Sequence, residues 1–98
     1  MLMLAIHQTP SLTRERYEEV VRRLTGKDRL ESPADLPFPG VLFHAAGETE
    51  DGFCIFDVFE SEDAVARFNE AMSSIPREVG IEEPPKFPRA HRHRAFAQ

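Results

Sequence analysis

Residues 53–59 read Phe-Cys-Ile-Phe-Asp-Val-Phe, and this run narrows the possible folds most. Side chains alternate between the two faces of a strand. One face of this run carries Phe53, Ile55, Asp57 and Phe59, and the other carries Cys54, Phe56 and Val58. Both faces are mainly apolar, which is typical of a strand buried on both sides. We therefore expect either a dimer whose sheets pack face to face or an open apolar cavity that binds a ligand.

Three further strands are expected around this run. Residues 1–7 and 41–46 are apolar stretches of strand length, and residues 87–96 can form a fourth strand. Gly47 and Gly52 flank a polar stretch between 41–46 and 53–59, which predicts a hairpin connection.

Two segments have the residue spacing of amphipathic helices. The first has the apolar stripe Tyr17, Val20, Val21 and Leu24. Ser11 or Thr13 can cap its start, and Gly26 is a typical stop. The second begins after Ser61, and Pro76 must kink or end it. Residues 27–40 contain three prolines without periodicity, so we expect a connecting crossover loop rather than a functional lid.

The order β-α-β-β-α-β predicts one α+β domain over residues 1–98 with a ferredoxin-like fold. Its four-stranded antiparallel sheet has the expected strand order 4-1-3-2, with both helices on one face. The other face must then be exposed to solvent or covered by a partner. Because residues 53–59 are apolar on both faces, we favour a homodimer through this helix-free face.

Composition excludes several classes of function. The 98 residues have a net charge of −5, which disfavours binding to nucleic acid or to an anionic membrane. No apolar run approaches the ~20 residues of a bilayer span, and the start does not resemble a signal peptide. The single cysteine suits a reducing compartment, so we expect a cytoplasmic protein.

The hairpin brings two candidate catalytic residues together. With Ala46 opposite Phe53, His44 lies diagonally across from Asp57 on one face. Residues 2, 4 and 6 suit the helix side of the first strand, which leaves His7 on the helix-free side with this pair. His91 and His93 share one face of the last expected strand.

A histidine backed by a carboxylate can act as a general base, because the carboxylate orients the ring and stabilises its charged form. We therefore name His44 and Asp57 as candidate catalytic residues. The candidate ligand-binding residues are His7, Leu42, Phe53, Ile55, Phe59, His91 and His93. A purely structural His44–Asp57 pair remains the main alternative, and a histidine-based metal site is a third interpretation. We expect Tyr17 to be a core residue, and we assign no metal ligand and no cofactor.

The segments 40–47 and 51–61, with their continuation 62–68, resemble small bacterial members of the dimeric α/β-barrel superfamily, which includes antibiotic biosynthesis monooxygenase-like proteins. The resemblance implies a homodimer with a barrel-like shared core and a pocket between each sheet and its helices. The superfamily's monooxygenases and haem-degrading members use an active-site tryptophan, and this chain has none. No catalytic residue therefore transfers from the resemblance.

Three functions remain open on the sequence. The first is a small monooxygenase-, isomerase- or cyclase-like enzyme that acts on a hydrophobic or aromatic molecule. The second is a non-catalytic dimeric ligand-binding or accessory domain. The third is a metal or haem binder through His44 with His91 or His93.

Overall fold

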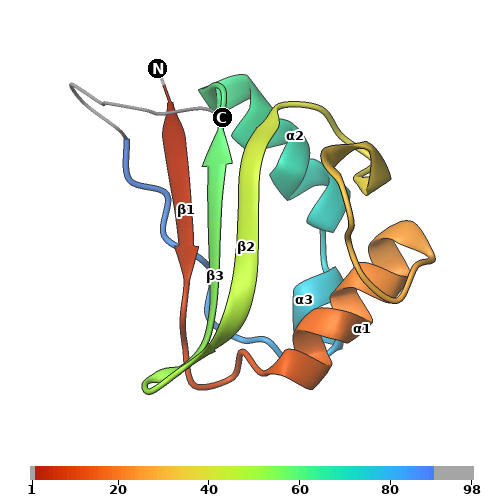
Figure 1. Cartoon of the computed structure of the whole chain (residues 1–98), viewed down its shortest axis with the longest axis vertical. Coiled ribbons are helices and arrows are strands. Elements are labelled where there is room, and N and C mark those ends of the chain that lie inside the picture. The colour runs from red at the N-terminus through yellow and green to blue at the C-terminus, as the bar shows by residue number, and fades with distance from the viewer. Residues whose placement is uncertain (1, 90–98) are drawn as a thin grey trace.

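The computed structural model describes residues 2–89 as an α+β fold (Figure 1). The elements in chain order are β1 (Met3–His7), α1 (Arg14–Thr25), a 3-10 helix (Pro33–Asp35), β2 (Val41–Thr49), β3 (Gly52–Phe59), α2 (Glu62–Met72) and α3 (Ile75–Glu78). This order confirms the expected α+β class and the positions of both long helices.

The three strands form one antiparallel sheet in the order β1-β3-β2, with β3 in the centre. The expected fourth strand, residues 87–96, lies largely outside the described residues. Within them, isolated bridges join Lys86 to Ile6 and Arg89 to Met3 along the free edge of β1. Arg89 also forms an ion pair with Glu62 of α2, so the segment after α3 packs on this domain.

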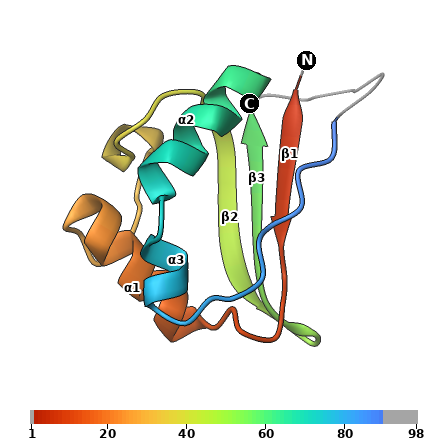
Figure 2. The ribbon, with the colours of Figure 1, turned by 180° about the vertical axis from the view of Figure 1, so that it is seen from behind.

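Both long helices begin at the residues that the sequence indicates, and α1 also ends as expected, but α2 ends at Met72, before Pro76, which lies in α3. The Thr13 side chain accepts a hydrogen bond from the Arg16 backbone N–H, and Ser61 accepts one from Ala64. Gly26 ends α1 in the left-handed conformation. All three α-helices lie on one side of the sheet, as the front and back views show (Figures 1 and 2).

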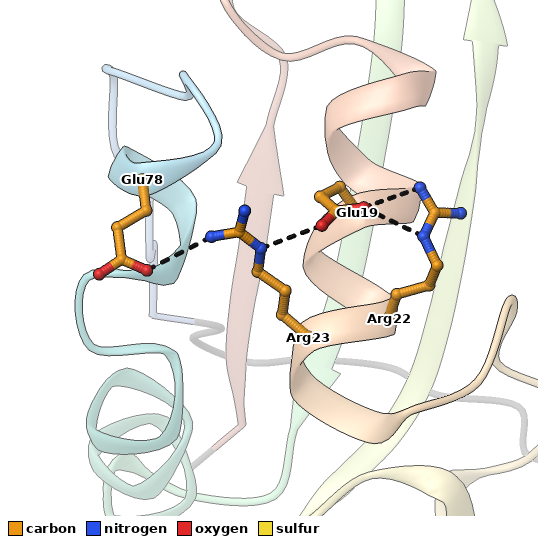
Figure 3. Close-up of polar contacts among 4 residues, drawn as sticks. All are labelled: Glu19, Arg22, Arg23 and Glu78. Atoms are coloured by element: carbon orange, nitrogen blue, oxygen red, sulfur yellow. Dashed lines mark hydrogen bonds and ion pairs between the residues drawn. The ribbon is translucent and has the colours of Figure 1, made fainter.

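An ion-pair network joins α1 to α3 (Figure 3). Glu19 binds Arg22 and Arg23 along α1, with N–O distances of 2.9 and 3.0 Å. Arg23 also reaches Glu78 of α3 at 3.5 Å. The network is exposed, so its contribution to stability is small.

The core consists of two apolar clusters between the sheet and the helices. One contains Met3, Ala5, Phe59, Ala64 and Val65, and the other contains Leu12, Val20, Phe53 and Ile81. The first cluster joins β1 and β3 to α2, and the second joins β3 to α1 and the segment after α3.

The assignment of strand faces was wrong. Phe53, Asp57 and Phe59 are buried beneath the helices, and Ile55 packs against the second cluster on the same side. In β1 the buried residues are Met3 and Ala5 rather than residues 4 and 6. The face with His7, His44 and Asp57 is therefore the helix-covered face.

The helix-free face is apolar along all three strands. The register places Ile6 opposite Phe56, and Val58 pairs with both Leu4 and Phe43. Ile6 and Phe43 are 39% and 52% exposed, which is high for such side chains. This exposed apolar face agrees with the sequence of β3, whose residues are apolar on both faces.

The predicted hairpin register was off by two residues. His44 pairs directly with Asp57, and Ala46 pairs with Ile55. The strands extend to Thr49 and Gly52, so the connecting turn is shorter than predicted. A shift of two residues keeps every side chain on its face, so His44 and Asp57 still lie on one face.

Candidate functional site

A chain of hydrogen bonds runs from Tyr17 on α1 through His44 on β2 to Asp57 on β3. The Tyr17 hydroxyl lies 2.7 Å from His44 Nε2, and His44 Nδ1 lies 2.5 Å from Asp57 Oδ1. The Tyr17 and His44 rings stack at 5.9 Å between centroids, and Phe53 packs against Tyr17 at 5.2 Å. Three elements thus hold the three side chains in one orientation.

The partners of His44 fix its protonation pattern. An ionised Asp57 can only accept, so Nδ1 of His44 carries the proton that bonds to it. In the neutral ring, Nε2 is then an acceptor, and the Tyr17 phenol donates to it. Asp57 is 7% exposed, and this bond compensates part of the cost of its burial.

Tyr17 is held in its neutral form. Burial raises the pKa of its phenol to about 12, and the negative charge of Asp57 adds to the shift. The phenol therefore remains a hydrogen-bond donor at every physiological pH. Loss of its proton without replacement would leave a buried phenolate beside Asp57 and is therefore unfavourable.

The hydrogen-bonded chain borders a cavity of about 410 Å³ between the sheet and the helices. Tyr17, His44 and Asp57 all line it. Most of the remaining wall is apolar, including Val20, Met72 and Ile81. This volume lies within the range of small-molecule sites, which are mainly apolar with a few polar groups.

His7 lines the same cavity from β1. Its Nε2 donates to the backbone carbonyl of Glu83 at 2.8 Å. Burial lowers the pKa of His7, although the Glu83 carbonyl partly opposes the shift. His7 is thus a neutral ring on the same face as His44 and Asp57, as the sequence predicts, although that face is covered.

The proline-rich loop forms part of the cavity wall. Leu30, Leu36 and Phe38 line the cavity, and Phe38 is buried with its ring edge against Phe68. A salt bridge between Lys27 and Asp35 closes the loop on itself. The loop is a crossover, as expected, and it also encloses the site.

The other predicted ligand-binding residues have different positions. Ile55 and Phe59 line the cavity, whereas Phe53 is buried behind Tyr17 and does not. Leu42 is 56% exposed and lies outside the cavity wall, next to an irregularity in the pairing of β2. His91 and His93 fall outside the described residues.

Sequence reasoning missed the role of Tyr17. Its place in the apolar stripe of α1 predicts a core residue, and its ring is indeed half-buried. The available signal was its hydroxyl, because a buried tyrosine usually needs a hydrogen-bond partner. Because the sequence analysis placed His44 on the helix-free face, it did not identify His44 as that partner.

Within residues 2–89, no group of three or more histidine, cysteine or acidic side chains is arranged to hold a metal ion. The metal interpretation relied on His91 or His93, which lie beyond this range. None of the described helices has the length and apolar character to cross a membrane.

No protein-family model, no curated protein and no solved structure matches the chain.

Proposed function

We propose that the protein is a small enzyme that moves a proton at a carbon atom of an apolar ring-containing molecule, as an isomerase or cyclase does. The observation that carries the proposal is the Tyr17–His44–Asp57 chain at the wall of an apolar cavity. Among the monooxygenase, isomerase and cyclase reactions, the last two suit this chain best, because proton transfer is the chemistry that it supplies.

The proton moves along the existing hydrogen bonds. The Tyr17 oxygen takes a proton from a carbon next to a substrate carbonyl while its own proton passes to His44 Nε2. The C–H electron pair moves into the enolate, and Asp57 stabilises the imidazolium. Reversal of the relay returns a proton to the substrate. Tyr17 is neutral before and after the step, which agrees with its raised pKa.

A carbon-acid exchange reaction tests this proposal without knowledge of the natural substrate. 2-Tetralone is a two-ring ketone whose ring protons next to the carbonyl exchange with D₂O, and NMR follows their loss. We expect the protein to accelerate this exchange. Tyr17→Phe and His44→Gln should each lower the acceleration by about 10²-fold or more, because each interrupts the relay.

The exposed variant Glu50→Gln at the hairpin tip is the matched control and should exchange at the wild-type rate. Circular dichroism establishes that the site variants remain folded. Equal rates for the wild type and Tyr17→Phe would exclude the relay.

A non-catalytic ligand carrier is the second candidate. The hydrogen bonds of the site favour this function, because Tyr17 and Asp57 already bind both nitrogens of His44 and leave neither free for a substrate. Binding of 2-tetralone, followed by NMR line broadening, without faster exchange would support this function instead.

The functional unit that we propose is a homodimer of ferredoxin-like domains, each completed by residues 87–96 as a fourth strand. Its support is the apolar helix-free face, where Ile6 and Phe43 are exposed. Burial of such a face against a second copy removes apolar surface from water and is favourable. The two cavities would then open away from the interface, on the helix side of each sheet.

A further inference from the structure

The cavity has a polar rim on one side. Asn69, Ser73 and Arg77 line it from the end of α2 and from α3, and all three are exposed. They follow one another at intervals of four residues, and the Ser73 backbone N–H bonds to the Asn69 carbonyl. An amide, a hydroxyl and a guanidinium therefore border the opening of an otherwise mainly apolar cavity.

These side chains are available to a ligand. Among residues 2–89, none of the three takes part in a side-chain hydrogen bond or an ion pair. The nearest acid in sequence, Glu78, is already bound by Arg23 (Figure 3). It also accepts a hydrogen bond from the Ser74 hydroxyl. The network between α1 and α3 thus leaves the positive charge of Arg77 without a partner in the described chain.

Two of the three acidic side chains in the cavity wall already have partners. Asp57 is bonded to His44, and the Glu83 carboxylate accepts from the Ser11 hydroxyl. Glu82 also borders the cavity and is exposed. Arg77 is the single lysine or arginine among the lining residues that the structure describes, so an anionic group has one place to bind.

The volume limits the size of the ligand. A cavity of about 150 Å³ holds one benzene ring. The cavity of about 410 Å³ is therefore suited to an apolar body of about two or three rings.

We propose that the cavity takes an apolar molecule of this size with one anionic group, which Arg77 binds at the rim with Ser73 and Asn69. This inference rests on the proposed function, because it names the substrate class of the same site. The rings lie along the apolar wall near Tyr17, and the anionic group remains at the solvent-accessible opening.

Two fluorescent probes separate the charge from the apolar body. 8-Anilinonaphthalene-1-sulfonate and N-phenyl-1-naphthylamine share the same rings, but only the first carries a sulfonate. We expect wild-type protein to bind the sulfonate probe more tightly. Arg77→Gln should weaken the sulfonate probe about fivefold, because the ion pair is exposed, and should leave the neutral probe unchanged.

Arg67→Gln is the matched control. Arg67 is exposed on α2 and does not line the cavity, so the same loss of charge there should alter neither probe. Met72→Trp fills the cavity and should weaken both probes, which locates them there rather than on the helix-free face. Glu82→Gln removes a lining negative charge and should tighten the sulfonate probe.

The outcomes distinguish this inference from the proposed function. Equal effects of Arg77→Gln and Arg67→Gln on the sulfonate probe, or tighter binding of the neutral probe to wild type, would overturn the anion site. Probe binding involves no proton transfer, so these measurements test the anion site independently of the relay. If the protein does not accelerate the exchange but the two probes bind as expected, the proposed function fails and the anion site still stands.

Discussion

At the scale of single residues, the site depends on a tyrosine whose acidity is altered by its surroundings. Tyr17 is the single tyrosine of the chain, and the chain has no tryptophan. Its phenol donates to His44 and lies near the charge of Asp57, which opposes a second negative charge. Any titration signal from a phenol in this protein therefore comes from the site itself.

We predict that Tyr17 ionises near pH 12 in the folded protein, compared with about 10 in the unfolded chain. Because the folded pKa is raised, the stabilisation is fully present below pH 10 and is lost as the pH rises toward 12. Ultraviolet absorbance of the phenolate measures the ionisation, and urea unfolding measures the stability.

Tyr17→Phe should show a flatter decline of stability over this alkaline range. The same titration in denaturant provides the reference and should give the ordinary tyrosine pKa. A folded-state midpoint near 10 would contradict the buried, hydrogen-bonded position of the phenol.

At the scale of elements, the caps and stripes of the helices were predictable because they depend on local chemistry. Thr13, Ser61 and Gly26 have the expected roles, since each acts through backbone groups a few residues away. The faces of β3 were not predictable, because both of its faces are apolar and periodicity cannot choose between them.

The choice was made from the first strand, where residues 2, 4 and 6 suit the helix side, and it was wrong because Met3 and Ala5 are the buried residues. Asp57 can lie on the covered face because its partner His44 allows it to be buried. The two residues were predicted as a pair, and the surface on which they lie depends on Tyr17 from a helix. Such a contact between distant elements leaves no local signature in the sequence.

The proline-rich loop ends at a glycine whose role is open to a direct test. A Cβ at Gly40 would lie 2.5 Å from the Ala64 Cβ, and its φ of +96° disfavours other residues. Gly26 at the other end also has a positive φ, but a Cβ there meets nothing within 4 Å.

We predict that Gly26→Ala lowers the free energy of unfolding by about 1 kcal/mol, from backbone strain alone. Gly40→Ala should cost about 2–4 kcal/mol, because overpacking against α2 adds to the strain. Urea denaturation measures both. Equal costs for the two variants would mean that the contact between the loop and Ala64 is loose.

At the scale of the whole molecule, the apolar residues fall on both sides of one thin sheet. The helices cover one side and enclose the cavity, while Leu4, Ile6, Phe43 and Phe56 lie on the other. An apolar sheet face of this kind is expected to be covered in solution. The proposed homodimer covers it without closing the entrance to the site.

We predict that Ile6→Glu converts the homodimer to a monomer, because a charge at a buried interface is strongly unfavourable. Sedimentation velocity measures the change in mass. Ile55 would be a poor choice for this test, since it faces the helices and its replacement would disturb the core.

The exposed replacement Glu50→Gln should leave the mass unchanged and provides the control. A monomeric wild-type protein at micromolar concentration would rule out the homodimer. It would leave the cavity and its hydrogen-bonded chain unaffected.

The irregular pairing between Val41 and Phe43 limits how copies of the chain can associate. β2 is the outer strand of the described sheet, and a long regular outer strand can template the addition of another strand. The irregularity breaks the row of backbone groups near the start of β2 and locally increases its twist. The addition of further strands at this edge, and with it growth into fibrils, is thereby disfavoured.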